Sequence, residues 1–246
     1  MAFSLFKKRY STRPIFEALG TDMHCHLIPQ VDDGSKCTEE SIECLRTLQD
    51  VGYKKVYITP HFCCPRFPND EEDIKRRFTQ LLKDAEAAGI TIEIAGISGE
   101  YRIDSGFKAR LEQPSFLKLA DQYVLVELSL HQQFLSADEL IFDTQMKGYD
   151  VILAHPERYP YLNIDGDHIQ RLMNQGVLLQ TNVLSLGGFY GEEAKRRAFA
   201  MIERGWVNFL GTDTHNALYC QALRDVSCSR KVEKILEKYE FMNNEL

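Results

Sequence analysis

The stretch Thr21-Asp22-Met23-His24-Cys25-His26-Leu27-Ile28-Pro29-Gln30-Val31-Asp32-Asp33-Gly34 decides how the rest of the chain is interpreted. Residues i and i+2 of a strand face the same side, so His24 and His26 can point at one metal ion. Asp32 and Asp33 follow closely, and oxygen ligands beside imidazoles suit a divalent first-row metal. One such histidine pair can also arise by chance or belong to a packed core, so the remaining sequence must decide.

The composition is that of an ordinary globular protein. The chain has 246 residues, 44% hydrophobic and 26% charged, enough for one large α/β domain or two small ones. A net charge of −7 argues against a surface for nucleic acid or anionic membranes. It does not argue against an anionic substrate, because bound cations can reverse the local field.

Cysteine usage and the first residues indicate the compartment. The seven cysteines are odd in number and form no CxxC motif, which favours reduced thiols in a cytoplasm over disulfides or a structural zinc site. In residues 1–20 an apolar segment precedes Lys7-Lys8-Arg9, the reverse of a signal peptide. No segment approaches the roughly 18 apolar residues of a membrane-spanning helix. We predict a cytoplasmic protein with residues 1–20 as an N-terminal extension.

Strand-like and helix-like segments alternate seven times along the chain. The predicted strands are the opening stretch and residues 54–61, 91–100, 123–127, 150–158, 177–182 and 207–215. The predicted helices span about 38–52, 71–88, 137–147, 167–174, 192–204 and 217–238, with a short helical patch near 116–120. Such alternation predicts a parallel sheet in one domain over residues 21–246. We expect an α/β fold, an irregular (β/α)7 barrel, with a doubly wound open sheet as the alternative.

Histidines and carboxylates collect where six of these strands end. The residues are His24, His26, His61, Glu100, Glu127, His155, Asp213 and His215. In α/β barrels the active site lies at this end of the strands. So many ligands exceed the needs of one tetrahedral ion, so we predict two or three ions. Such ions lower the pKa of a bridging water and hold the oxygens of a phosphate.

Two arginines belong to the same rim. Arg158 follows His155 by three residues and Arg102 follows Glu100 by two. A guanidinium binds phosphate oxygens in bidentate fashion. We interpret Arg158 as a phosphate ligand, with an ion pair to Glu157 as the alternative. Arg102 is left open between phosphate binding and a structural ion pair, for instance with Asp104.

These motifs resemble the PHP (polymerase and histidinol phosphatase) superfamily. Within it, the chain is similar to bacterial metal-dependent tyrosine-protein phosphatases linked to capsular polysaccharide production. The matching pieces are Asp22-Met23-His24-Cys25-His26-Leu27-Ile28-Pro29, Val31-Asp32-Asp33-Gly34, Thr59-Pro60-His61, Gly99-Glu100, Ala154-His155-Pro156-Glu157-Arg158 and Gly211-Thr212-Asp213-Thr214-His215-Asn216. The HxHxxP…DDG opening together with AHPER is specific to this subgroup.

The resemblance implies a (β/α)7 barrel with up to three divalent ions, commonly manganese, or Fe, Zn, Mg or Co in its place. It assigns His24, His26, Glu100 and Asp213 to one ion, Glu100, Glu127 and His155 to a second, and Asp33, His61 and His215 to a third. Asp33 is preferred over Asp32 for its spacing from His26. The implied substrate is a phosphotyrosine protein, a bacterial tyrosine kinase with a tyrosine-rich tail, hydrolysed by attack of a metal-bridging hydroxide.

One departure from the family concerns phosphate binding. Family members often have an arginine about five residues after the last histidine, where this chain has Cys220. We expect Arg224, one turn further along the helix, to replace it, or Arg158 to carry more of the binding.

Other functions are weighed against this one. A small-molecule phosphatase, such as a histidinol-phosphate phosphatase, would share the metal site. A weakly active regulator of a polysaccharide assembly complex is a further alternative. An amidohydrolase barrel usually has a carbamylated lysine where this chain has Glu100, which counts against it. No Cys-x5-Arg loop is present, which excludes a thiol phosphatase.

Overall fold

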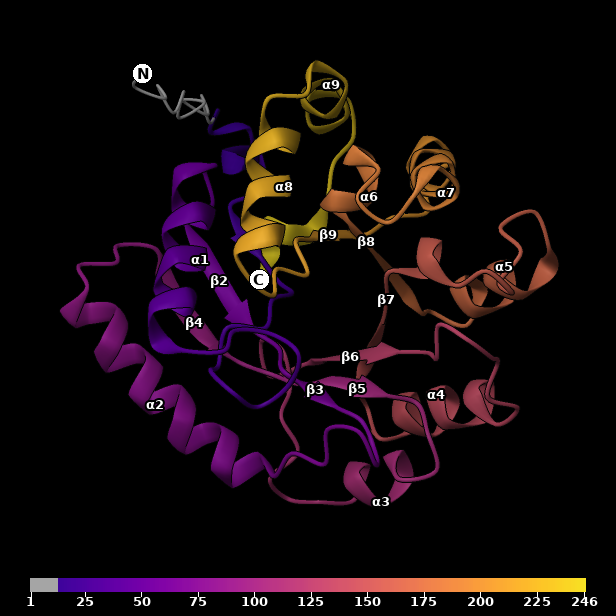
Figure 1. Ribbon diagram of the computed structural model, residues 1–246. Helices are drawn as coiled ribbons and strands as arrows, with labels where there is room; N and C mark the ends of the chain where they lie inside the picture. Colours follow the sequence, from indigo (N-terminus) through magenta and orange to yellow (C-terminus); the bar gives the residue numbers. More distant parts are fainter. Residues whose placement is uncertain (1–12) are drawn as a thin grey trace, which may run out of the picture.

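The computed structural model describes residues 13–246 and confirms a mixed α/β fold with parallel sheets. Its strands are β1 (Thr21–Asp22), β2 (Lys55–Ile58), β3 (His61–Phe62), β4 (Glu93–Ile97), β5 (Glu100–Arg102), β6 (Tyr123–Glu127), β7 (Asp150–Ala154), β8 (Leu178–Asn182) and β9 (Phe209–Gly211). One sheet has the order β1-β2-β4 and the other β3-β5-β6-β7-β8-β9, and the pairings between these strands are parallel. The strands occupy the middle of the molecule and the helices surround them (Figure 1).

The helices alternate with the strands, as the sequence predicts. They are α1 (Thr38–Asp50), α2 (Glu71–Ala87), α3 (Phe107–Leu111), α4 (Ala137–Met146), α5 (Asp167–Asn174), α6 (Val183–Gly187), α7 (Glu192–Glu203), α8 (Ala217–Ser227) and α9 (Arg230–Lys238). Three short 3-10 helices are η1 (Ile15–Ala18), η2 (Pro156–Arg158) and η3 (Met242–Glu245). Across residues 13–246, none of the helices has the length and apolar character needed to cross a membrane.

Two of the predicted strands are each divided in two. The predicted strand 54–61 becomes β2 and β3, because Pro60 has no N–H to donate to a ladder. The predicted strand 91–100 likewise becomes β4 and β5. Main-chain hydrogen bonds continue across the gap, from Ser98 N to Ile58 O (2.9 Å) and from Glu100 N to Pro60 O (2.9 Å). The chain therefore runs from one sheet directly into the other twice, from β2 into β3 and from β4 into β5.

Both faces of the strands β6 to β9 are buried. On β6, Val124 and Val126 belong to the large core cluster, whereas Leu125 belongs to a smaller cluster. The smaller cluster consists of Met23, Leu119, Leu125, Ile152, Ala154, Phe209 and Leu246. Successive residues of a strand face opposite sides. The strand residues of the large cluster and those of the smaller cluster therefore lie on opposite faces of the strands. Two-sided burial explains why these strands read as continuous apolar runs.

Two helix predictions are wrong. The predicted patch near 116–120 is not helical, and α3 lies ahead of it. Ala120 and Asp121 have φ of 47° and 60°, which ends any helix there. The predicted helix 217–238 is two helices, α8 and α9. Ser229 separates them, and its side chain accepts a hydrogen bond from Val232 N as the N-cap of α9.

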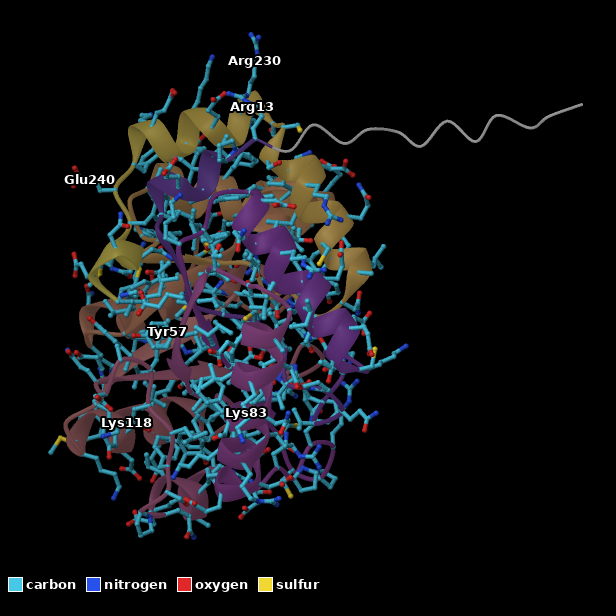
Figure 2. All side chains as sticks on the ribbon, turned by 90° about the vertical axis from the view of Figure 1, so that its left-hand side faces the viewer. Arg13, Tyr57, Lys83, Lys118, Arg230 and Glu240 are labelled. Carbon is cyan, nitrogen blue, oxygen red and sulfur yellow. The ribbon has the colours of Figure 1, made fainter. Side chains whose placement is uncertain are left out.

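The predicted N-terminal extension, residues 1–20, lies in part outside the described residues. Within the described part, Phe16 is buried and stacks on Tyr53 with ring centroids 5.2 Å apart. Arg13 donates to Glu233 of α9 at 2.9 Å, and Figure 2 shows it at the end of the molecule that carries Arg230. Packing of the chain therefore begins ahead of residue 21.

Candidate metal centre

The parallel register brings the strand-end side chains together. His61 pairs with Glu100 between β3 and β5, and Arg102 pairs with Glu127 between β5 and β6. Eight of the nine predicted metal ligands fall into four overlapping groups whose ligand atoms lie within 4.8 Å of one another. The groups are His26, His61 and His215; His24, His26 and Asp213; His24, Glu100 and His155; and His61, Glu100 and Glu127.

The His24 and His26 rings face each other through their Nε2 atoms, 3.2 Å apart. The Nδ1 atom of His24 lies 2.9 Å from Gln180 Oε1, and that of His26 lies 3.0 Å from Asp32 Oδ2. Both partners are acceptors, so each Nδ1 carries a proton, and each Nε2 can offer its lone pair to a cation whenever its ring is neutral. This arrangement is the usual outer support of metal-binding histidines.

Two buried carboxylates meet the same point. Glu100 Oε2 lies 3.4 Å from Nε2 of both His24 and His26. Asp213 Oδ1 lies 3.5 Å and 3.3 Å from the same two nitrogens. Four electron-rich atoms thus converge in a buried space, where they are stable together only around a cation or after protonation.

Glu100 joins this group to the next. Its Oε1 lies 2.8 Å from His155 Nε2, and its Oε2 lies 2.9 Å from His61 Nδ1. Glu127 Oε1 lies 3.4 Å from that same His61 nitrogen. Glu100 Oε2, His61 Nδ1 and His155 Nδ1 are buried without an aligned hydrogen-bond partner. Buried polar atoms are seldom left unpaired, so the donor set fits bound divalent ions.

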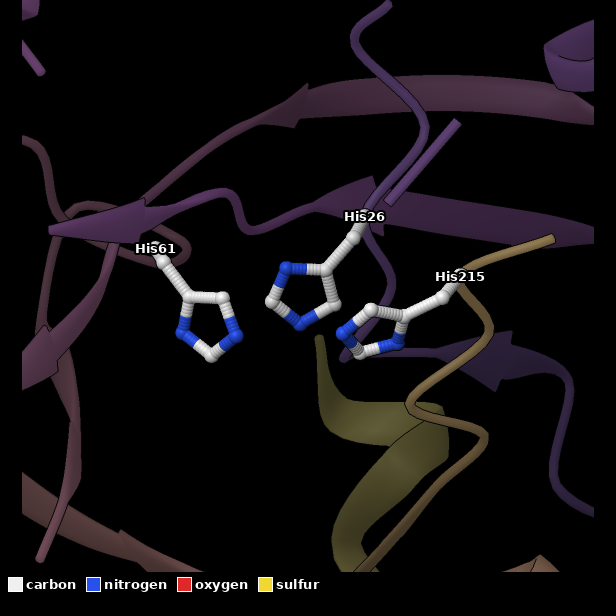
Figure 3. Close-up of side chains that lie close together, drawn as sticks. All are labelled: His26, His61 and His215. Atoms are coloured by element: carbon white, nitrogen blue, oxygen red, sulfur yellow. The ribbon is translucent and has the colours of Figure 1, made fainter. Parts of the chain in front are cut away.

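A third group lies nearer the surface. Asp33 Oδ1 lies 3.4 Å from His61 Nε2 and 3.7 Å from His215 Nε2. Figure 3 shows the imidazoles of His26, His61 and His215 side by side. His215 Nδ1 bonds to the main-chain oxygen of Asp213 at 2.7 Å, which leaves its Nε2 for Asp33 and an ion. Neighbouring Asp32 instead supports His26 and accepts from His61 N at 2.9 Å. The two adjacent aspartates therefore have different positions in the centre.

The ionisation of the centre follows from this crowding. Burial disfavours a charged His26 ring, and so does the charge of His61, but hydrogen bonds to Asp213 and Asp32 raise the pKa of His26 to about 9. Burial would also raise the pKa of the Glu100 carboxyl, yet the charges of His24 and His61 hold that pKa well below its usual range. Without a cation, protons on the imidazoles must balance the carboxylates.

Two of these residues sit on unusual backbone. His155 has φ of 38° and Asp213 has φ of 54°, in the left-handed region that residues other than glycine seldom adopt. His155 directly follows β7, and Asp213 lies two residues after the end of β9. Strained backbone of this kind concentrates at functional sites.

Arg158 borders the centre. Its Nη1 donates to Asp213 Oδ2 at 2.8 Å, and its guanidinium lies over the Tyr190 ring at 4.1 Å from the centroid. The alternative of an ion pair with Glu157 is not what the structure has. Glu157 accepts from Asn182 N and Ser185 Oγ instead. Burial lowers and the Asp213 charge raises the pKa of Arg158, with a net rise.

Arg102 has a structural partner. Its Nε donates to Glu127 Oε1 at 2.8 Å. Asp104, the partner suggested by the sequence, accepts from Cys64 N and Gly106 N instead. Arg102 therefore supports a carboxylate of the centre.

The structure does not bring Arg224 to the centre. Its Nη2 donates to Glu43 Oε1 and Thr47 Oγ1 of α1, each at 2.7 Å. Cys220 is buried against Cys44 of the same helix, with sulfur atoms 3.3 Å apart. Residues four apart share one helix face, so both side chains point at α1. The structure therefore gives no support to Arg224 as the replacement of the family arginine, which leaves the alternative that Arg158 carries more of the phosphate binding.

The sequence reasoning missed three polar residues near the centre. Gln180 supports His24, while Asn182 Nδ2 and Tyr190 Oη both donate to Asp213 Oδ2, at 2.7 Å and 3.0 Å. Gln180 and Asn182 lie two apart in β8, so they share a face. Two polar residues with this spacing in a buried strand are a signal that could have identified Gln180 and Asn182.

Fold and site together define a class: an α/β protein with a candidate histidine–carboxylate metal centre at the carboxyl ends of parallel strands. Residues 20–243 match the family described as capsular polysaccharide synthesis, CpsB/CapC. The chain belongs to this family.

Named relatives agree with the family match. The chain is 29% identical over 196 residues to tyrosine-protein phosphatase YwqE of Bacillus subtilis, covering 79% of this chain and 77% of YwqE. It is 30% identical over 202 residues to tyrosine-protein phosphatase CpsB of Streptococcus pneumoniae, covering 79% and 82%.

Solved structures extend the comparison to the fold. A chain from the crystal structures of YwqE and CpsB, described as unique metal-dependent tyrosine phosphatases, aligns with a TM-score of 0.78 and 26% identity, covering 92% of this chain and 91% of that one. A lactonase from Listeria monocytogenes aligns with a TM-score of 0.52 and 13% identity, covering 95% and 92%, a likeness of fold alone.

Proposed function

We propose that this protein is a metal-dependent protein-tyrosine phosphatase, a phosphoric monoester hydrolase of capsular or exopolysaccharide production. The observation that carries the proposal is the set of four overlapping ligand groups at the strand ends. The naming of relatives as tyrosine-protein phosphatases supports the substrate class. The proposed substrate is a phosphotyrosine protein, in particular the tail of a bacterial tyrosine kinase.

The proposed ions are divalent, up to three, with manganese the first choice. One would be held by His24, His26, Glu100 and Asp213, a second by Glu100, Glu127 and His155, and a third by Asp33, His61 and His215. When bound, such ions supply an activated water and positive charge for phosphoryl oxygens.

The remaining side chains position this centre. Gln180 and Asp32 fix the tautomers of the two facing histidines. Arg158, held by Asp213 and packed on Tyr190, offers its guanidinium to the phosphate beside the ions. Because Asp213 also accepts from Asn182 and Tyr190, the arginine is anchored to a carboxylate that is itself held in place.

We extend the proposal to the architecture and the compartment. Asp213 N donates to His24 O at 2.8 Å and His26 N to Thr214 O at 2.9 Å, so the ends of β9 and β1 are linked. These bonds support one irregular (β/α)7 barrel in a single domain over residues 21–246. We place the protein in the cytoplasm, in keeping with its thiols.

The test is turnover of p-nitrophenyl phosphate after chelation and after manganese is added back. Activity should disappear with the chelator and return with the metal. His24→Ala and His155→Ala should lose it, whereas His131→Ala should keep it, because His131 lies outside the four ligand groups. The proposal fails if all three variants match the wild type. A preference for histidinol phosphate over phosphotyrosine peptides would replace the protein substrate by a small molecule.

A further inference from the structure

The centre opens toward its outer group. The side chains of His24, His26 and Glu100 are fully buried, whereas Asp33 is 42% exposed. Arg158, which borders the same centre, is 18% exposed. A phosphate ester must therefore arrive past Asp33 and Arg158, and its leaving group must stay on that side.

Three half-buried aromatic residues, Phe189, Tyr190 and Tyr219, border this opening, and we call them the aromatic wall. The Phe189 ring centroid lies 5.0 Å from that of Tyr190 and 4.8 Å from that of Tyr219. Gly188 and Gly191 flank the first two with φ of 85° and 96°, so a tight turn presents them.

The aromatic wall touches two groups that would meet the phosphate. Tyr190 lies under the Arg158 guanidinium at 4.1 Å. Tyr219 stacks on the His215 imidazole, with centroids 4.8 Å apart. In an aryl phosphate only one oxygen separates phosphorus from the ring. A ring attached to a phosphate at Arg158 and the outer ligands must therefore lie within contact distance of residues such as these.

The other aromatic side chain at the outer group is already covered. Phe67 stacks on His61 with centroids 5.5 Å apart, and the Arg66 guanidinium lies over it at 4.8 Å. Arg66 is in turn held by Asp33 Oδ2 at 3.0 Å. The Phe67 ring therefore already has the His61 imidazole and the Arg66 guanidinium as partners.

We propose that the aromatic wall is an aryl subsite that binds the ring of the phosphate ester, and that Tyr219 is its specificity-determining residue. The proposal rests on the proposed function and adds where the leaving group lies. Offset or edge-to-face ring contacts favour an aromatic group over an alkyl group of similar charge.

The experiment measures binding of phenylphosphonate and methylphosphonate to the manganese-saturated protein by calorimetry. Neither probe can be hydrolysed, so differences in leaving-group reactivity do not enter. Tyr219→Ala should weaken phenylphosphonate by about three- to tenfold, the size of one aromatic contact, and leave methylphosphonate within about twofold. Tyr219→Phe keeps the ring and should bind both probes like the wild type.

Phe67→Ala is the matched control, because it removes a ring stacked on the other outer histidine. It should change both probes by the same factor. Manganese affinity is measured for every variant, so that damage to His215 is detected separately. Equal weakening of both probes by Tyr219→Ala would mean that Tyr219 only positions His215, and would overturn the subsite. A selective loss in Phe67→Ala, or equal affinities of the wild type for both probes, would overturn it as well. If neither probe binds and no ester is turned over, the proposed function itself fails.

Discussion

The inner and outer parts of the centre are built differently. The inner part, His24, His26, Glu100, His155 and Asp213, has side chains at most 2% exposed. The outer part, Asp33, His61 and His215, ranges from 9% to 42%. Inner imidazoles are held by buried partners such as Gln180, whereas Asp33 is held by Arg66, itself 65% exposed.

This difference indicates a division of labour. Buried ligands with outer hydrogen-bond support, such as His24 and His26, keep their geometry without a substrate, which is the condition for preorganised charge stabilisation. Exposed ion pairs contribute little and rearrange easily. We therefore expect the inner part to set the charge and spacing of the proposed ions, and the outer part to adapt when a phosphate enters. Five variants, in four predictions, test this comparison, in order of expected effect.

Glu100→Gln should have the largest effect. Its carboxylate contributes to two of the four ligand groups and contacts four histidines, so one charge is lost from both inner ion sites. We expect kcat/KM for p-nitrophenyl phosphate to fall by about a thousandfold or more. Steady-state kinetics and metal content by mass spectrometry provide the measurement. A smaller loss than in Asp33→Asn would reverse the roles assigned to the two parts.

Asp33→Asn should remove the outer ion and leave the others. Metal content should fall by one ion per chain, and kcat/KM by about ten- to a hundredfold, because the inner sites keep all their ligands. Elemental analysis of the purified variant, beside the wild type, checks the stoichiometry. Loss of every ion would show that the inner part does not hold metal independently.

Gln180→Ala and Arg66→Ala compare the supports of the two parts. Gln180 fixes the His24 ring from a buried position, so its loss should weaken manganese binding about tenfold. Arg66 supports Asp33 from solvent, so its loss should weaken binding by less than about threefold. Calorimetric titration of manganese into both variants measures the two affinities. Equal effects would contradict the distinction between rigid and adaptable parts.

Arg224→Ala should have the smallest effect, because it lies outside both parts. We expect kcat/KM within about twofold of the wild type. The free energy of unfolding should fall by up to about 1 kcal/mol, from the partly exposed pair with Glu43. Urea denaturation and kinetics on the same sample test both statements. A tenfold drop in kcat/KM would return Arg224 to the phosphate site.

Much of this centre could be predicted from the sequence, for a physical reason. Parallel strands end on the same edge, so residues that end separate strands become neighbours even when far apart in the chain. That rule alone brings His61 together with Glu100. The division of labour between Asp32 and Asp33 also agrees with the predicted preference for Asp33, although metal binding itself remains a prediction.

Other features depend on tertiary packing and could not be predicted in this way. The support of His24 by Gln180 requires β7, β8 and β9 to be neighbours in a known order. The placement of Arg224 depends on the rotation of α8 about its axis, which α1 decides by packing on Cys220. Ser229 is the N-cap of α9, but the helical periodicity of the sequence continues across it. The pattern therefore predicted one continuous helix.

The left-handed backbone at His155 and Asp213 has a consequence for mutational tolerance. Backbone of this kind costs on the order of 1–3 kcal/mol per residue, and glycine relieves it. At most positions in a protein, alanine is a milder replacement than glycine. At these two positions the ranking should invert, so that glycine variants of the metal-free protein melt at higher temperature than their alanine counterparts. At each of these positions, the difference between the alanine and glycine variants therefore measures the cost of the backbone conformation apart from the loss of the side chain.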